Sequence, residues 1–230
     1  MNIVTYQWGT KYGPSDVRLL KSMVDRHLAM PHGFVVVTDN PAAYQSEPDI
    51  SVVALQQVGE HRLFCGEKLF TFHPEAGQLL GDRFAVMDLD CVVTRSLDPL
   101  FERDEPVVVW RNPSRRPWRN PSVPSRALYN GSLVLMKAGA RPDVWHRFAK
   151  GEAWDYHGDQ DWFSAVLGPD MPYWDDGDGV YRLAREDTPG SGITGDLPGN
   201  ARLVFFVGSE HKPDLPSVRS RYPWIVEHRT

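Results

Sequence analysis

The feature that most constrains the fold is the alternation of short apolar runs with helix-like segments through roughly the first ninety residues. The runs are rich in β-branched residues and are predicted to be buried strands at residues 3–6, 34–38, 50–55 and 84–87. Between the first two, residues 14–28 have apolar side chains at helical spacing. Alternation of this kind predicts an α/β fold, with a mainly parallel central sheet and helices on both faces.

The rest of the chain continues this pattern less regularly. Further strands are predicted at residues 107–110, 133–136 and 203–207, and helices at 67–73, 141–150 and 159–167. Two segments rich in Pro, Gly or Arg, residues 112–126 and 188–200, are predicted to be loops. No linker-like segment divides the chain, so we expect one domain over residues 1–230.

Composition narrows the possible functions. A chain of 230 residues with 41% hydrophobic residues can bury a sizeable core, and its net charge of −5 argues against nucleic-acid binding.

No apolar stretch is long enough to predict a transmembrane helix, and no secretory signal is visible at the start. The two cysteines, Cys65 and Cys91, lie in apolar surroundings and are expected to be free core residues. A cytoplasmic location is expected.

Two carboxylates follow the predicted strand at residues 84–87. Asp88 and Asp90 stand at its carboxyl end, which is where ligands bind in open α/β sheets. Two adjacent carboxylates repel each other unless a cation lies between them, and oxygen-only ligands suit Mg²⁺ or Mn²⁺. The alternative is that Asp88 caps a turn and Asp90 is solvated.

The motif and its surroundings resemble the glycogenin-like family of retaining glycosyltransferases, which have the GT-A fold. The resemblance rests on Asp88-Leu89-Asp90, Ser96-Leu97-Asp98-Pro99-Leu100-Phe101, Glu67-Lys68-Leu69, Tyr129-Asn130-Gly131-Ser132, Gly158-Asp159-Gln160-Asp161 and Lys212-Pro213. These motifs occur in the order found in the family and span about residues 2–214. The resemblance implies an enzyme that transfers a sugar, with retention, from a nucleotide-diphosphate donor, with a UDP-sugar favoured, to a saccharide or other glycan.

The resemblance also implies roles for individual residues. Asp159 and Gln160 would act at the donor sugar as the catalytic pair, and Asp88 and Asp90 would bind the metal ion. The residues implied in donor binding are Lys68, Asn130, Lys212 and Tyr6. Each has a simpler alternative: a surface lysine for Lys68, a turn residue for Asn130 and a helix N-cap for Asp159.

One position departs from the family. Its members have a histidine in the last strand as a third protein ligand to the metal, and this sequence has Phe205-Phe206-Val207-Gly208 there. His211, next to Lys212, is a candidate substitute. The alternative is that His211 faces solvent and that the site uses only the two aspartates, or does not work as an enzyme.

Two other functions remain open at this stage. Asp88-Leu89-Asp90-Cys91-Val92 also fits the nucleophile motif of haloacid-dehalogenase-type phosphatases, although that motif normally lies near the start of the chain. The absent strand histidine would also suit a degenerate glycosyltransferase that binds a nucleotide or glycan without turnover.

Overall fold

The central sheet passes through the middle of the molecule. The computed structural model describes residues 1–55, 65–113, 127–183, 192–206 and 212–230. Seven strands form this sheet: β1 (Asn2–Gln7), β2 (Gly33–Thr38), β3 (Ser51–Ala54), β4 (Arg83–Met87), β6 (Val107–Arg111), β7 (Tyr129–Lys137) and β8 (Tyr173–Trp174). Their order is β3-β2-β1-β4-β7-β6-β8.

Strand direction in this sheet matches the predicted mainly parallel arrangement. β1, β2, β3 and β4 run parallel to one another, and β6 pairs in parallel with β8. Only β7 runs the other way, between β4 and β6. The amino-terminal end of β7 therefore lies at the same edge of the sheet as the carboxyl end of β4.

A second, smaller sheet continues directly from the first. It contains β5 (Cys91–Val93), β10 (Leu203–Phe205) and β9 (Val180–Arg182), in the order β5-β10-β9. β5 starts three residues after β4 ends, so residues 88–90 connect the two sheets. The predicted metal-binding motif thus occupies the junction between them.

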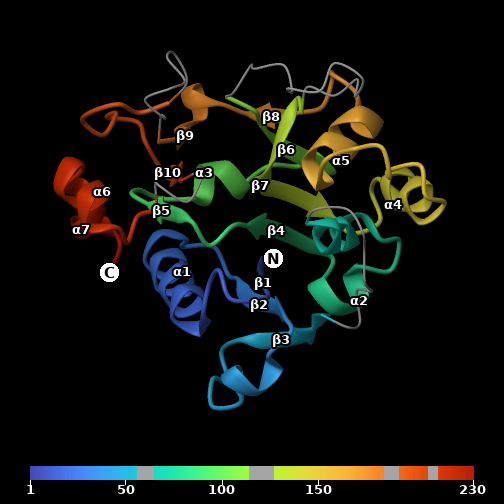
Figure 1. Ribbon diagram of the computed structural model, residues 1–230, viewed down its shortest axis with the longest axis horizontal. Coiled ribbons are helices and arrows are strands. Elements are labelled where there is room, and N and C mark those ends of the chain that lie inside the picture. Colours follow the sequence, from blue (N-terminus) through green and yellow to red (C-terminus); the bar gives the residue numbers. More distant parts are fainter. Residues whose placement is uncertain (56–64, 114–126, 184–191, 207–211) are drawn as a thin grey trace.

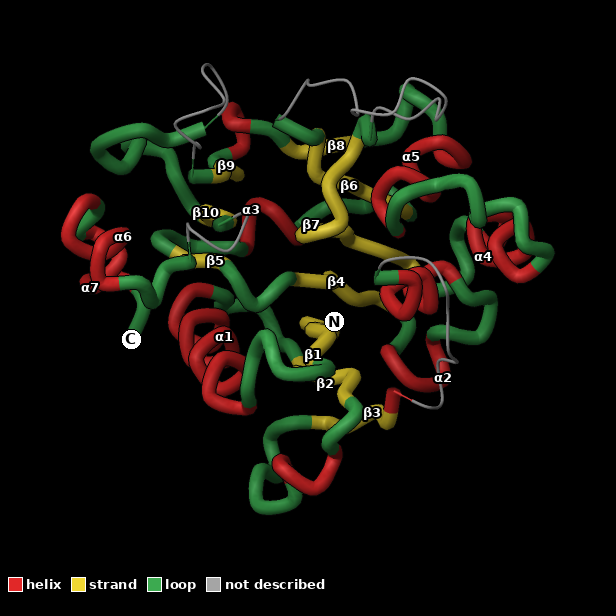
Figure 2. The backbone as a smooth tube through the Cα atoms, in the orientation of Figure 1, coloured by secondary structure: helices red, strands yellow, loops and turns green. Residues whose placement is uncertain are grey.

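Helices cover both faces of the large sheet, as Figures 1 and 2 show. The α-helices are α1 (Pro14–His27), α2 (Gly77–Leu80), α3 (Asp98–Phe101), α4 (Pro142–Ala149), α5 (Asp159–Leu167), α6 (Pro216–Arg221) and α7 (Trp224–His228), and the 3₁₀ helices are η1 (Pro41–Tyr44), η3 (Gly66–Phe72) and η4 (Asp176–Asp178). In Figure 1, α1, α6, α7 and the small sheet lie to the left, and α2, α4 and α5 to the right.

The alternation of side chains along each strand produces two core layers. Ile3 packs in the layer shared with α1 and the small sheet, whereas Val4 and Tyr6 pack in the layer shared with η3, α4 and α5. Both layers are apolar because the strands are covered on each face. Each fully buried Val, Ile or Leu side chain contributes about 1.5–3 kcal/mol.

Local sequence explains how α1 begins. Pro14 occupies the first helical position, where its missing N–H is no loss, and Asp16 accepts the N–H of Gly13 at 2.8 Å. The apolar stripe of the helix buries Leu20 and Met23 against the sheet. The loop between β1 and α1 is thereby held at the carboxyl edge of the sheet.

The fold predicted from the sequence is confirmed, with local differences. The segment at 67–73 is a 3₁₀ helix rather than an α-helix, and the strand predicted at 133–136 already begins at residue 129. Short strands β5, β8 and β9 were not predicted because two or three residues carry too little periodicity. Of the two predicted loops, that at 112–126 lies almost wholly outside the described residues, whereas residues 192–200 of the other are described and contain no helix or strand, as predicted. Within the described ranges, no helix is both long and apolar enough to cross a membrane.

Candidate functional site

The site starts where β4 ends. Leu89 is buried in the core layer beside α1, whereas the neighbouring Asp88 and Asp90 side chains keep 31% and 14% of their surface exposed. Both carboxylates raise the pKa of the Tyr12 hydroxyl, after the larger effect of its burial. Because Leu89 is buried in the core, the carboxylates on either side of it lie where β4 ends, at the edge of the sheet.

Asp88 belongs to a cluster of polar groups, of which Asp159 is buried and the others are half-buried, called here the Asp88 cluster (Lys68, Asp88, Ser132 and Asp159). Lys68, from η3, donates to Asp88 Oδ1 at 2.8 Å and to the Gly131 carbonyl at 2.8 Å. Ser132 Oγ donates to Asp88 Oδ2 at 2.7 Å. Asp159 Oδ2, at the start of α5, lies 3.9 Å from Lys68 Nζ. Three elements distant in sequence thus meet around one lysine.

An irregularity in β7 brings this strand to the cluster. Val109 pairs with Val134, but the next residue, Trp110, pairs with Asn130, so residues 131–133 bulge out of register. Such bulges redirect side chains and are frequent beside active sites. A Cβ at Gly131 would lie 2.9 Å from Asp159 Oδ2, so a larger residue there would displace the Asp159 carboxylate.

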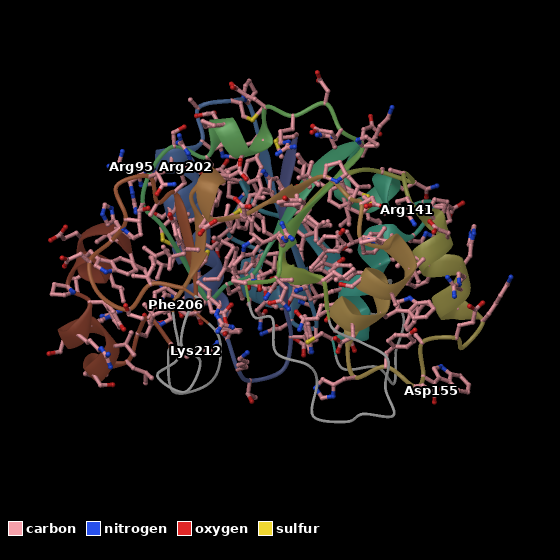
Figure 3. The ribbon with its side chains drawn as sticks, turned by 90° about the horizontal axis from the view of Figure 1, so that it is seen from above. Arg95, Arg141, Asp155, Arg202, Phe206 and Lys212 are labelled. Atoms are coloured by element: carbon pink, nitrogen blue, oxygen red, sulfur yellow. The ribbon has the colours of Figure 1, made fainter. Side chains whose placement is uncertain are left out.

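Asp90 belongs to a second cluster, called here the Asp90 cluster (Tyr12, Asp90 and Lys212). Tyr12, in the loop between β1 and α1, donates its hydroxyl to Asp90 Oδ2 at 3.0 Å. Lys212 Nζ donates to the same carboxylate oxygen and to the Tyr12 hydroxyl oxygen. Figure 3 shows Lys212 on the same side of the molecule as Phe206, whose backbone N–H donates to the Asp90 carbonyl at 2.8 Å.

The carboxyl-terminal Arg229 braces the segments that supply the Asp90 cluster. Its guanidinium bonds Asp214, two residues beyond Lys212, at 2.7 Å and lies 3.7 Å from Asp16. Asp16 in turn accepts the N–H of Gly13, next to Tyr12. The Arg229 side chain is 1% exposed, whereas its partner Asp214 is 49% exposed, so only the arginine end of this brace is buried.

The two clusters differ in charge. In the Asp88 cluster, two carboxylates share one ammonium, and burial raises the pKa of Asp159 to about 6 despite the opposing effect of Lys68. Burial alone would lower the pKa of Lys68, but Asp88 and Asp159 raise it overall, so Lys68 stays charged. In the Asp90 cluster, one carboxylate meets Lys212. A ligand with a negative group at one end would therefore bind with that end at Lys212 and its other end at the Asp88 cluster.

The raised pKa of Asp159 predicts a pH effect on stability. The unfolded carboxyl ionises near its ordinary pKa of 3.8, while the folded one retains its proton up to about 6. The free energy of unfolding should therefore fall as pH rises through this window, by on the order of 2–3 kcal/mol. Asp159→Asn should remove that fall in urea unfolding at pH 4 and pH 7. Asp155→Asn, at an exposed position seen at the periphery in Figure 3, is the control. If the free energy of unfolding changes with pH by the same amount in the parent and in Asp159→Asn, the pKa of Asp159 is not the cause.

The other predicted residues have distinct positions. Asn130 Oδ1 accepts the Ser132 N–H at 2.8 Å, so only its Nδ2 group could donate to a ligand. Gln160 is half-buried in the first turn of α5. Tyr6 is 6% exposed, and burial raises its pKa to about 12; its hydroxyl lies 3.3 Å from Thr71 Oγ1. This burial favours a role beneath η3 over direct contact with a ligand.

The carboxylates Asp88 and Asp90 fit a magnesium or manganese ion by their chemistry, since both ions prefer oxygen ligands. Over the described parts of the chain, no group of three or more His, Cys, Asp or Glu side chains is arranged to hold a metal. His211 lies outside those parts, so its role as a ligand stays a prediction. Phe206 is buried in the core, and its side chain cannot replace the family's histidine.

Comparison with solved structures identifies the fold. The galactosyltransferase LgtC, solved in complex with donor and acceptor sugar analogues, matches with a TM-score of 0.64 and 14% identity over 99% of this chain and 94% of its own. GlyE from Streptococcus pneumoniae TIGR4 matches with a TM-score of 0.65 and 14% identity over 94% of this chain and 57% of its own. The chain has a GT-A glycosyltransferase fold.

A third similar structure agrees with this result. Mouse xyloside xylosyltransferase 1 matches this GT-A chain with a TM-score of 0.58 and 12% identity, over 91% of this chain and 98% of its own. No protein-family model matches the sequence, and a search of curated proteins found no match. At these identities the comparison confirms the fold predicted by the resemblance, and the activity of this chain is a matter for proposal.

Sequence reasoning missed two residues of this GT-A site. Tyr12 bonds Asp90, and Ser132 bonds Asp88, although neither was a predicted site residue. The Ser132 contact follows from its motif, because Asn130-Gly131-Ser132 was expected to lie near the donor. No comparable signal marked Tyr12, whose position depends on how the loop before α1 folds over β4.

Proposed function

We propose that residues 1–230 form one catalytic unit, a metal-dependent glycosyltransferase of the glycogenin-like family, that transfers a sugar from a nucleotide-diphosphate donor with retention. The GT-A fold favours this activity over the haloacid-dehalogenase-type phosphatase. A UDP-sugar is the favoured donor and a glycan the acceptor, as the resemblance implies. The cytoplasmic location is part of the same proposal.

One observation carries the proposal: the Asp88 cluster has one more carboxylate than ammonium groups, whereas Lys212 balances Asp90 in the Asp90 cluster, so the two halves of the site differ in charge. Glycosyl transfer places positive charge on the sugar ring and negative charge on the departing diphosphate. The Asp88 cluster offers the buried carboxylate of Asp159 to the sugar. Lys212, in the Asp90 cluster, offers an ammonium to the diphosphate. The charges of the protein thus match those that develop during the reaction.

The residues then have separate tasks. Lys68 holds Asp88 and Asp159 at one place through contacts at 2.8 and 3.9 Å. Asp159, which is ionised above pH 6, faces the sugar together with Gln160. A Mg²⁺ or Mn²⁺ ion held by Asp88 and Asp90 would neutralise part of the charge on the diphosphate.

Gln160→Ala tests whether the start of α5 faces the sugar. Loss of one hydrogen bond to a sugar hydroxyl should weaken the binding of a UDP-sugar by about 1–3 kcal/mol while leaving UDP almost unaffected. Calorimetric titration with UDP and with a panel of UDP-sugars measures both affinities in Mn²⁺. The control is Gln78→Ala, at an exposed position on α2. Equal weakening of both ligands would reject the assignment.

A further inference from the structure

A second lysine lies beside the Asp90 cluster. Lys11, in the loop before α1, is exposed, and its Nζ lies 4.9 Å from the centre of the Tyr12 ring. Lys212 Nζ lies 5.1 Å from the centre of the same ring. Tyr12 also donates to Asp90, so two ammonium groups and one carboxylate are arranged around one aromatic side chain.

The charges of these groups do not cancel. Around the Tyr12 ring, two ammonium groups accompany the one carboxylate that Tyr12 contacts directly, Asp90. Two like charges brought this close destabilise each other unless an anion lies between them. The arrangement is therefore suited to an anionic ligand.

We propose that Lys11 is a second phosphate-binding lysine, which forms with Lys212 a clamp for the diphosphate of the donor. This inference rests on the proposed function and extends it by one residue. Lys212 is the half-buried member, anchored on Asp90. Lys11 is the exposed member, whose flexible stem lets its ammonium move onto a phosphate oxygen.

The clamp has a consequence for the metal. A diphosphate held by two ammonium groups is partly neutralised without any cation, so the site depends less on a third protein ligand to the metal. We therefore expect measurable binding of UDP and of inorganic pyrophosphate in EDTA. Mn²⁺ should strengthen this binding rather than be required for it.

Calorimetric titrations with pyrophosphate, UDP and uridine, each in EDTA and in Mn²⁺, test the clamp. Lys11→Gln should lower the affinity for pyrophosphate and for UDP roughly five- to tenfold in EDTA, because one charge-assisted contact is lost. Uridine, which has no phosphate, should bind as it does to the parent. Lys150→Gln, at an exposed position after α4, makes the same charge change away from the site and should alter nothing.

The outcomes separate the clamp from the proposed function. If Lys11→Gln binds pyrophosphate and UDP within twofold of the parent, the clamp is wrong and the glycosyltransferase proposal stands. If the parent binds pyrophosphate, Lys11→Gln weakens it, and UDP binds no better than pyrophosphate, the clamp stands and the nucleotide donor is wrong. If the parent binds neither pyrophosphate nor UDP, both are overturned.

Discussion

An Asp88→Asn variant should fold and yet bind UDP no more tightly in Mn²⁺ than in EDTA. The amide keeps the shape of the carboxylate; its one oxygen can still accept from Lys68, while its Nδ2 group would donate to Ser132 Oγ, so the loss of stability should stay near ~1–2 kcal/mol. A neutral amide is a poor ligand for a divalent cation, and Mn²⁺ would lose one of its two proposed protein ligands. We expect the Mn²⁺-dependent gain in UDP affinity to fall tenfold or more.

The measurement is calorimetry of UDP binding, with chemical unfolding in parallel to establish that the variant is folded. Asp49→Asn, at an exposed position before β3, is the control for the change of charge. A variant whose UDP affinity keeps the full Mn²⁺ dependence of the parent would exclude Asp88 as a metal ligand. If the variant lost binding because it unfolded, the unfolding curve would show this, which distinguishes unfolding from loss of the metal ligand.

Lys68→Met should have the largest effect on stability. The Lys68 side chain is 10% exposed and is the cation between Asp88 and Asp159. Its removal leaves two carboxylates together; breaking a buried pair costs about 3–5 kcal/mol, and because Asp88 is 31% exposed we expect a loss of about 2–4 kcal/mol. Because a divalent cation can take the place of the lost ammonium, Mn²⁺ should restore part of this stability by mass action.

Urea unfolding in EDTA and in Mn²⁺ measures both parts of this prediction. Lys137→Met, at the exposed end of β7, should change the free energy of unfolding by less than about 0.5 kcal/mol. A loss below about 1 kcal/mol for Lys68→Met would show that the carboxylates do not depend on Lys68. If Lys68→Met has the same free energy of unfolding in EDTA and in Mn²⁺, no cation enters the Asp88 cluster.

The fold was largely predictable from the sequence, because buried parallel strands leave continuous apolar runs such as residues 34–37. The helix at 159–167 was predicted with the bounds that the structure has. The strand at 203–205 was also predicted; the prediction extended to residue 207, whereas Phe206 lies outside the strand and residue 207 outside the described residues. What could not be predicted was the second sheet, since β5 and β9 have only three residues each and gain their stability from pairing with β10.

The site was predictable in its parts but not in its pairings. The motifs marked Asp88, Asp90, Lys68 and Lys212, yet nothing in the sequence indicates that each aspartate has its own lysine. That pairing depends on long-range geometry, above all on the bulge in β7. The roles assigned to these residues stay predictions until ligands are tested.

The most direct test of the central claim is donor cleavage. The parent protein and Asp88→Asn would be incubated in Mn²⁺ with a panel of nucleotide sugars, and free nucleotide diphosphate followed by ³¹P NMR. We expect at least one UDP-sugar to yield UDP with the parent protein and none with the variant. If UDP-sugars bind the parent but none is cleaved with any glycan acceptor supplied, the protein is a binding protein and the claim of catalysis is wrong. Release of inorganic phosphate from a simple phosphate ester, without cleavage of any nucleotide sugar, would contradict the account in favour of a phosphatase.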